Sequence, residues 1–407
     1  MDLATNKARA LLTGGKTKKE AWKYLECLDH QLRDLQQAYS KNATPDYFLG
    51  GLGASLFYHN LFQVTQNSEH KKKCQSFFKM AYGAIGEISV ADNWYGGIAG
   101  AAWLAEHLKR EKGRKWPPGQ DPHLDFDRYL ISKIKKASSL GAYWLVGEWV
   151  GYGAYALERF PNGKSREILE SLVKFLAFHS KKSPQGRAWF TPKSVAPSAM
   201  RKKLRSGFYN LGVARGIPGV IGFLSEALKK GISEKITRPL LEESVAWFLD
   251  QDHGQHYPLF IPHNCIIGRA KKVIPPFGWC HGDLGIAPVL INAGQALQND
   301  RVERRGLEIG LRACRFTKST AGVEGPLFCH GASGIVHIFN RLYQMTGKEI
   351  FRQKALFWAN DLFDRLQVKL PFGYSLIEGQ TGIGLCLLSA ISNKELHWDR
   401  PLMVSFS

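Results

Sequence analysis

Cysteine is scarce in this chain, which has seven among 407 residues and therefore an odd number. Such a count favours a reducing compartment, where cysteines bind metals or act in catalysis more often than they form disulfides. The chain also lacks any run of about 18 apolar residues, the length that a membrane-spanning helix needs. Its first residues, Met1 to Lys7, contain no apolar signal region. We therefore expect a cytoplasmic protein without a membrane span.

Acidic residues are outnumbered by basic ones, with 35 Asp and Glu against 55 Lys and Arg, and the formal net charge is +20. A strongly basic surface attracts acidic partners such as a peptide, a nucleic acid or an anionic membrane. The basic clusters contain no interleaved aromatic residues and accompany no nucleic-acid-binding signature, so we expect no nucleic acid partner. The charge alone does not decide between the remaining partners.

Strand patterns are missing too, because no segment sustains an alternation of apolar and polar residues. What recurs is a glycine motif, usually Gly-x-x-Gly followed by small or aliphatic residues. Its second glycines are spaced by 47, 51, 68, 66, 49 and 48 residues and lie at positions 53, 100, 151, 219, 285, 334 and 382. Apolar, helix-compatible stretches follow the motifs, and charged amphipathic stretches fill the intervals. The pattern predicts helical hairpins, each with a charged outer helix and an apolar inner helix.

The closure of these hairpins into a ring follows from their apolar inner helices. An open stack would expose apolar surface at both ends, whereas a ring buries it. We therefore predict an all-α fold, an α/α toroid of about seven helical hairpin repeats, formed by residues 1–407 as a single domain. The two longest intervals predict rim loops or small insertions near 187–206 and 253–277, which contain two and four prolines.

The residues directly before the glycine motifs occupy equivalent positions in the predicted repeats. In chain order they are Leu49, Gly96, Gly147, Arg215, His281, His330 and Glu378. One position earlier stand Phe48, Tyr95, Val146, Ala214, Cys280, Cys329 and Ile377. The first three repeats are apolar or small here, whereas the last four carry Arg, His, His and Glu together with two cysteines. Polar chemistry is therefore expected on one arc of one face, where the inner helices begin.

The sequence aromatic-Cys-His-Gly occurs twice, at 279–282 and at 328–331, in equivalent positions of neighbouring repeats. Thiolate and imidazole ligands suit zinc, and three protein ligands leave the fourth tetrahedral position open, as in catalytic zinc sites. The predicted ligands of one zinc ion are Cys280, Cys329 and His330. Because adjacent residues seldom both reach one ion, we place His281 beside the metal.

Three neighbouring side chains complete the expected site. Trp279 and Phe328 directly precede the two cysteines and are expected to form the walls of the site. Asp283 follows the first Cys-His-Gly sequence and is expected to cap the inner helix, because a carboxylate can accept from the unpaired N–H groups of a helix start.

These motifs resemble those of lanthionine synthetase C-like proteins, the cyclases of lantibiotic biosynthesis and their eukaryotic relatives. The resemblance rests on Trp279-Cys280-His281-Gly282, on Cys329-His330-Gly331 and on the segment 210–219, and the glycine repeats extend it over nearly the whole chain. It implies an α/α toroid with zinc held by Cys280, Cys329 and His330. The implied reaction is the addition of a peptide cysteine thiol to dehydroalanine or dehydrobutyrine, which forms a thioether ring. The implied partners are a precursor peptide with an acidic leader and a dehydratase or modification complex.

The chain departs from the family pattern at two positions. Family cyclases carry His where this chain has Arg215, and Asp where it aligns Trp144. Arginine does not exchange a proton near pH 7, although its fixed charge can stabilise an enolate. Proton delivery is then expected from His281, Glu378 or water.

Two functions of different classes follow. The first is an active zinc-dependent lanthionine-forming cyclase in which Arg215 holds the enolate or a peptide carboxylate, and His281 or Glu378 protonates. The alternative is a non-catalytic zinc-binding scaffold that binds a thiol-bearing or acidic precursor peptide for a partner enzyme. The complete set of metal ligands favours the cyclase, whereas the missing His and Asp favour the scaffold. A toroidal glycan-processing enzyme would need paired carboxylates, for which Glu148 and Glu378 are candidates, but it leaves the cysteine pairs unexplained.

Overall fold

The computed structural model describes residues 10–39, 45–86, 89–110, 116–117, 119–196, 201, 206–252, 254, 256–257, 260–262, 277–323, 325–367 and 373–406. The chain forms two compact units. The first unit comprises Met1–Ala91, Pro276–Trp279 and Cys314–Asp399. The second unit comprises Asp92–Pro275, Cys280–Ala313 and Arg400–Ser407.

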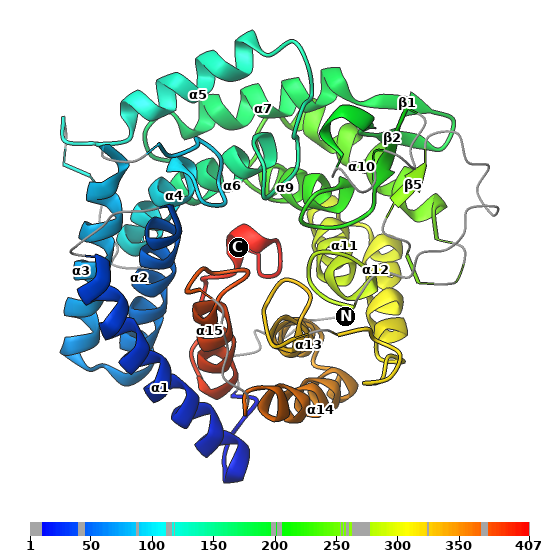
Figure 1. Cartoon of the computed structure of the whole chain (residues 1–407). Helices are drawn as coiled ribbons and strands as arrows, with labels where there is room; N and C mark the ends of the chain where they lie inside the picture. The colour runs from blue at the N-terminus through cyan, green and yellow to red at the C-terminus, as the bar shows by residue number, and fades with distance from the viewer. Residues whose placement is uncertain are drawn as a thin grey trace. The chain divides into compact units, whose positions relative to one another are not determined.

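The second unit contains two rows of helices that alternate along the chain (Figure 1). One row packs, in this order, α4 (Ile98–Arg110), α6 (Trp149–Arg159), α9 (Ile217–Lys229) and α11 (Asp283–Leu297). The other row consists of α5 (Leu124–Lys136), α7 (Ser165–His179), α10 (Glu234–Asp250) and α12 (Asp300–Ala313). Helix α7 packs on α6, α10 on α9 and α12 on α11, while α5 packs on α7. The short helix η3 (Arg400–Leu402) contacts α6.

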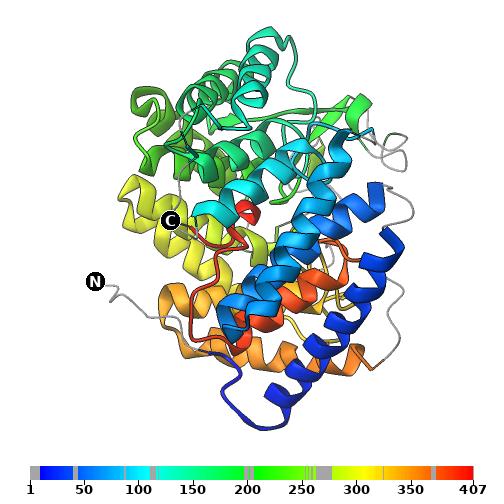
Figure 2. The same cartoon turned by 90° about the vertical axis from the view of Figure 1, so that its left-hand side faces the viewer.

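The first unit repeats this arrangement with segments from both ends of the sequence. Its first row packs α13 (Ala332–Thr346), α15 (Gln380–Ile391) and α2 (Pro45–Thr65) in this order. Its second row places α14 (Glu349–Arg365) on α13, α1 (Gly15–Tyr39) on α15 and α3 (Ser68–Gly83) on α2, and η1 (Ala84–Gly86) follows α3. Figure 2 shows α1 and α2, in blue, beside α15, in red.

The two rows differ in how much of each helix is buried. On α12, a single stripe is buried, formed by Val302, Gly306, Ile309, Gly310 and Ala313, which is the spacing of an amphipathic helix. On α9, every residue from Ile217 to Leu228 is buried. The predicted hairpins of a charged outer helix and an apolar inner helix are therefore confirmed, and we call α2, α4, α6, α9, α11, α13 and α15 the inner helices. In the described ranges, no helix is both long and apolar enough to cross a membrane.

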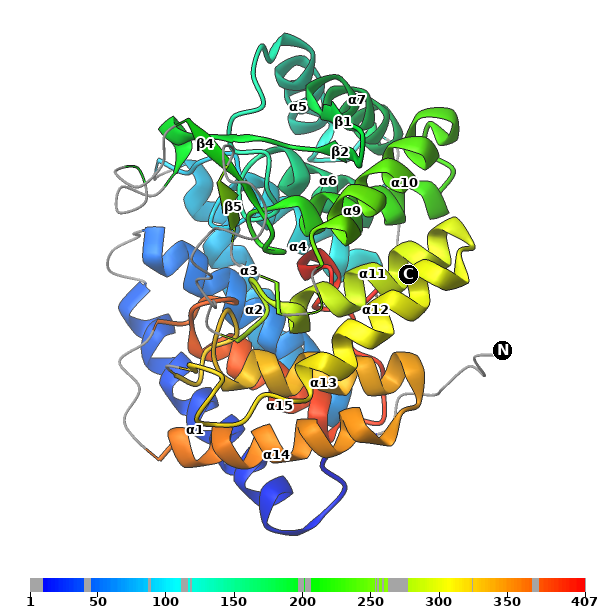
Figure 3. The same cartoon turned by 90° about the vertical axis from the view of Figure 1, so that its right-hand side faces the viewer.

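Five short strands of the described chain lie in the second unit, some of them in the predicted rim loops (Figure 3). Strands β1 (Lys181–Ser183) and β2 (Gly186–Ala188) form an antiparallel hairpin. Strand β4 (Gly207–Asn210) pairs antiparallel with β3 (Thr191–Pro192) on one side and β5 (Phe260–Pro262) on the other. The short helix η2 (Lys193–Val195) follows β3. Strands of two to four residues are too short to display a period of two, so the sequence did not predict them. Most of 253–277 lies outside the described residues.

The second glycine of each repeated motif is the third residue of its inner helix, except in the longer α2. An added Cβ there would overlap the carbonyl oxygen of the residue six positions earlier in the preceding loop. These glycine and carbonyl pairs are Gly100 and Trp94, Gly151 and Leu145, Gly219 and Val213, Gly334 and Phe328, and Gly382 and Leu376. Each of these five loops therefore folds back onto the first turn of its own helix, and only glycine allows this close approach.

The second unit also buries charged side chains between its helices. Glu158 of α6 is 5% exposed and forms a hydrogen bond of 3.0 Å with Nδ1 of His107 on α4. The guanidinium groups of Arg400 and Arg110 lie 3.7 Å and 3.9 Å from its carboxylate. Burial alone raises the pKa of Glu158, but the hydrogen bond with His107 and the nearby positive charges outweigh it and lower the pKa to about 2.

Glycine-to-alanine substitutions should have opposite effects on stability at different glycines, depending on whether an added Cβ would overlap a backbone carbonyl. Gly334→Ala should lower the free energy of unfolding by about 3 kcal/mol, because a backbone carbonyl cannot move away from the new methyl group. Gly83→Ala, at the end of α3 with no atom within 4 Å of an added Cβ, should instead stabilise the protein by about 0.5 kcal/mol. Guanidinium unfolding followed by circular dichroism measures both. Equal effects at the two positions would contradict the packing argument.

Glu158 predicts a loss of stability in acid. Its folded-state pKa of about 2 lies below its ordinary value of 4.5, so the unfolded chain takes up the proton first as the pH falls. Its contribution to stability is complete above pH 4.5 and disappears as the pH falls towards 2. Urea titrations at pH 6, 4.5 and 3 should show this decline, and a Glu158→Gln variant should show a shallower one. If the free energy of unfolding fell equally with pH in both proteins, Glu158 would not be a source of the acid sensitivity.

Candidate metal centre

Backbone hydrogen bonds connect the loops that precede neighbouring inner helices. In the second unit, Val146 N–H donates to Ala214 C=O at 3.1 Å, and Ala214 N–H donates to Cys280 C=O at 3.4 Å. In the first unit, Trp279 N–H donates to Cys329 C=O at 3.0 Å, and Cys329 N–H donates to Ile377 C=O at 3.1 Å. Five of these six residues hold equivalent positions in the repeats: Val146, Ala214, Cys280, Cys329 and Ile377. The loops therefore align in the register that the glycine spacing predicts.

The proximity of the two cysteines follows from one of these bonds. Because Trp279 pairs directly with Cys329 and Cys280 is the next residue of the chain, the second cysteine cannot lie far from the first. Gly278 packs against the same segment, and an added Cβ on it would lie 2.5 Å from the Cα of His330. Both aromatic-Cys-His-Gly sequences are thus joined by their backbones.

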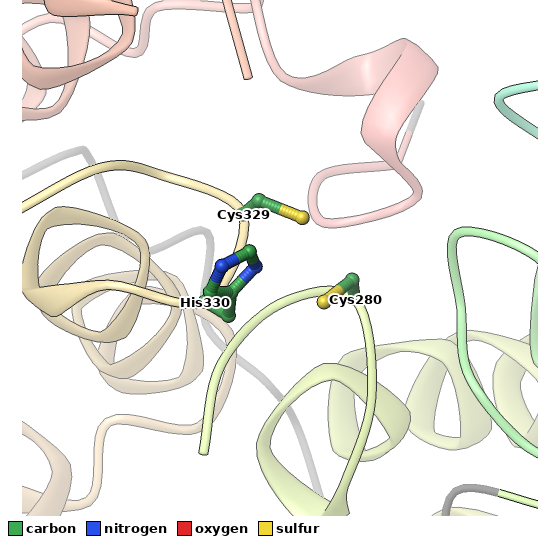
Figure 4. Close-up of side chains that lie close together, drawn as sticks. All are labelled: Cys280, Cys329 and His330. Atoms are coloured by element: carbon green, nitrogen blue, oxygen red, sulfur yellow. The ribbon is translucent and has the colours of Figure 1, made fainter. Parts of the chain in front are cut away.

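The side chains of Cys280, Cys329 and His330 converge in front of these paired loops (Figure 4). The two sulfur atoms and one imidazole nitrogen all lie within 4.8 Å of one another. Tetrahedral zinc with ordinary bond lengths separates its ligand atoms by roughly 3.3–3.8 Å, so a small inward movement would suffice to bind it. Cys280 is buried, whereas Cys329 is partly exposed, which leaves the group accessible from one side. The donor set and its spacing fit a zinc ion.

The three residues predicted to act beside the metal lie on the same paired loops. His281 is partly exposed, and its Nδ1 lies 3.0 Å from the sulfur of Cys280. Arg215 is exposed and follows Ala214, the residue that donates to Cys280. Glu378 is exposed and follows Ile377, which accepts from Cys329. Each of these residues is therefore close along the chain, or through one backbone hydrogen bond, to a cysteine of its own unit.

Trp279 and Phe328 support the loops from inside the first unit. Both side chains are fully buried, and their ring centroids lie 5.8 Å apart. Phe328 also packs edge-on against Trp398 and contacts His337 of α13. His337 is buried and lies 2.6 Å from the carboxylate of Asp399. The two rings fix the backbone from which Cys280 and Cys329 project, and their role as walls towards a substrate stays a prediction.

The predicted helix cap at Asp283 is wrong. Gly282 occupies the cap position of α11 without a side-chain hydrogen bond, and Asp283 is the first helical residue. Its buried carboxylate accepts hydrogen bonds from Arg312 Nε at 2.7 Å and from the backbone N–H of Tyr257 at 3.1 Å. The contact with Nδ1 of His256 is 2.5 Å. Asp283 therefore ties the start of α11 to α12 and to the segment before it.

The electrostatics of Asp283 explain why an acid is tolerated there. Burial raises the pKa of Asp283, but the hydrogen bonds from His256 and Arg312 outweigh burial, so the pKa lies below its ordinary value. The charged carboxylate is thus matched by a fixed cation. The sequence did not predict this contact, because nothing in the pattern around Arg312, near the end of α12, connects it with Asp283.

A second group of possible ligands in the described chain, formed by Glu106, Asp121 and His123, already surrounds a cation. The guanidinium group of Arg159 is fully buried and contacts Glu106 at 2.5 Å and Asp121 at 2.6 Å. Its Nε donates to Asp127 at 2.9 Å. These acids neutralise Arg159, so the group is explained as a buried ion-pair cluster.

The solved structure of a nisin cyclase is similar to this chain, with a TM-score of 0.74 over 95% of this chain and 97% of that one, at 17% sequence identity. At this identity the likeness shows the fold, and the predicted all-α fold class, an α/α toroid, is confirmed. A family model described as lanthionine synthetase C-like protein matches residues 42–403. The chain therefore belongs to the lanthionine synthetase C-like protein family.

A curated relative points the same way over a shorter stretch. The nisin biosynthesis protein NisC of Lactococcus lactis subsp. lactis is 27% identical over 147 residues, which are 33% of this chain and 34% of that protein. The match thus spans about a third of the relative's length.

Proposed function

We propose that this chain is a zinc-dependent lanthionine synthetase. It would add cysteine thiols of a precursor peptide to dehydroalanine or dehydrobutyrine residues and so form thioether rings. The observation that carries this proposal is the convergence of Cys280, Cys329 and His330 within 4.8 Å on paired loops. Membership of the family and the name of the similar structure, a nisin cyclase, agree with a cyclase role. The precursor peptide, a dehydratase partner and a cytoplasmic location remain predictions of this proposal.

The proposed chemistry uses the open side of the donor group. Cys280, Cys329 and His330 would hold the zinc ion, and the chemistry that it would supply is a lowered pKa of a peptide thiol, which makes the thiolate available at neutral pH. The loops keep both cysteines in register, because backbone hydrogen bonds link them. Partial exposure of Cys329 gives the peptide access from solvent.

The remaining steps fall to side chains of this chain. The peptide sulfur forms a bond to the β-carbon of the dehydrated residue, and the π electrons of that double bond pass to the adjacent carbonyl as an enolate. Arg215 is the fixed cation beside Cys280 and would stabilise this negative charge. A proton must then reach the α-carbon, and His281 and Glu378 are the nearby groups able to deliver one.

Metal content tests the ligand assignment. Wild-type protein dialysed against buffered zinc should bind about one ion per chain, as a three-ligand site requires. Cys280→Ala and His330→Ala should each weaken zinc binding at least ~100-fold, because loss of a group that merely hydrogen-bonds to a ligand already costs roughly 10–100-fold. Cys27→Ser, which removes an exposed cysteine on α1, should leave the zinc content unchanged. Equal zinc contents in all four proteins would refute the assignment.

Thiol consumption tests the reaction. A dehydrated, cysteine-containing peptide should lose its free thiol on incubation with the zinc-loaded protein, and mass spectrometry after alkylation should show a closed ring. Cys329→Ala should slow the reaction at least ~30-fold at pH 7, since only about 3% of an unassisted thiol is ionised there. Cys27→Ser is again the matched control. A rate that is the same with and without the protein would defeat the cyclase proposal.

A second candidate function is a non-catalytic scaffold that binds a thiol-bearing or acidic precursor peptide for a partner enzyme. It is favoured by Arg215, which stands where family cyclases carry His, and by Trp144 at the position aligned with the family Asp. Under this alternative the wild-type protein binds the peptide tightly and leaves its thiol unchanged. Arg215→His would then raise a weak thiol-adding activity, whereas it would lower or preserve the activity of a working cyclase.

A further inference from the structure

The end of α7 exposes a large aromatic side chain. Phe178 is 84% exposed, which is the greatest exposure among the large hydrophobic residues of the described chain. Phe175, one turn earlier, is buried against the core of the second unit. Because α7 already buries an apolar stripe, the outward position of Phe178 adds nothing to the packing of the helix. Such exposure leaves apolar surface available to a partner.

The ring of Phe178 contacts the next residue of the chain. It packs edge-on against His179, with centroids 5.0 Å apart and planes at 86°. His179 in turn packs on Phe175 at 4.4 Å. Burial and the nearby Lys181 lower the pKa of His179 below its ordinary value. Phe178 is therefore an exposed apolar side chain whose ring packs against a neighbouring histidine.

Three exposed lysines lie within four residues of Phe178 in the chain. Lys174 lies one turn before Phe178 on the same face of α7, and Lys181 and Lys182 follow on β1. All three are exposed, and within the described part of the chain none forms an ion pair. By contrast, the neighbouring Arg187 on β2 forms an ion pair with Glu243. The local excess of positive charge around Phe178 is thus uncompensated.

This surface lies at the end of the second unit where the inner helices begin. Phe175 packs against Trp149, the first residue of α6, with centroids 4.7 Å apart. The loop before Trp149 contains Val146, which is hydrogen-bonded to Ala214, and Ala214 donates to Cys280. The β1–β2 hairpin lies beside α10 (Figure 1). A continuous path of contacts therefore leads from Phe178 to the loop of the candidate metal centre.

We propose that Lys174, Phe178, Lys181 and Lys182, here called the α7 rim, bind an acidic segment of the precursor peptide. Carboxylates of the segment pair with the lysines, and an apolar side chain of the segment packs on Phe178. The identity of the segment as precursor rests on the proposed function. Charge complementarity favours an acidic segment. The exposed ring of Phe178 favours a segment that also contains an apolar residue between its acidic residues. The whole chain, at a net charge of +20, favours the same encounter.

A binding experiment on the full chain tests the α7 rim. The probe is a fluorescein-labelled peptide in which four Glu or Asp residues flank one Leu, and the comparison peptide carries Gln and Asn instead. Fluorescence anisotropy at 50 mM and 300 mM salt gives the Kd for each. Lys181→Glu/Lys182→Glu and Phe178→Ser are the test variants. Lys79→Glu/Lys235→Glu is the matched control, because both lysines are exposed and the change in charge is identical.

The α7 rim predicts a specific pattern. The Lys181→Glu/Lys182→Glu pair should raise the Kd of the acidic peptide at least ~10-fold at low salt and less at high salt, where screening weakens surface charges. Phe178→Ser should raise it several-fold at both salt concentrations. The control pair should change it by less than twofold. Equal weakening by test and control pairs would overturn the proposal, and so would binding of anionic phosphatidylserine vesicles or nucleic acid at this surface without binding of the acidic peptide.

The outcome separates this proposal from the proposed function. If wild-type protein closes rings while the rim variants bind the acidic peptide normally, the α7 rim fails and the cyclase stands. If the rim variants lose peptide binding while wild-type protein consumes no thiol, the rim stands and the cyclase fails.

Discussion

Trp279 and Cys329 are joined by a single backbone hydrogen bond of 3.0 Å, and Cys280 follows Trp279 in the chain. Because a thiolate ligand must be placed within a fraction of an ångström, this pairing matters more than the identity of the surrounding helices. The corresponding bonds from Val146 to Ala214 and from Ala214 to Cys280 extend the same alignment through the second unit. Ligands that are far apart in sequence thus share one backbone scaffold.

The loops before α4, α6, α9, α13 and α15 pack against the first turn of their own helix, which supports them in the position where these bonds form. That contact requires glycine as the third helical residue, because any side chain there would overlap a carbonyl oxygen of the loop. At Gly334, for example, an added Cβ would overlap the carbonyl oxygen of Phe328. The repeated glycines therefore have a structural cause that is separate from metal binding. They recur in repeats without cysteine, such as those of Gly100 and Gly151, for the same reason.

Much of this architecture could be predicted from the sequence, because glycine spacing and helix amphipathicity are local signals that repeat. The candidate ligands also emerged from local patterns, since Cys280 and Cys329 occupy matching positions. The partners of Asp283 could not be predicted, because Arg312 and Tyr257 lie on other elements and no periodic pattern connects them. The exposure of Phe178 escaped prediction as well. The sequence around a phenylalanine near a helix end does not indicate whether its side chain points into the core or towards solvent.

X-ray absorption at the zinc edge can establish the proposed ligand set, because it counts the atoms bound to the metal. The arrangement of Cys280, Cys329 and His330 predicts two sulfur atoms at about 2.3 Å and nitrogen or oxygen atoms at roughly 2.0–2.1 Å in the zinc-loaded protein. Replacing Cys280 with serine should reduce the sulfur count to one. A wild-type spectrum with only nitrogen and oxygen neighbours, or with four sulfur atoms, would contradict the account.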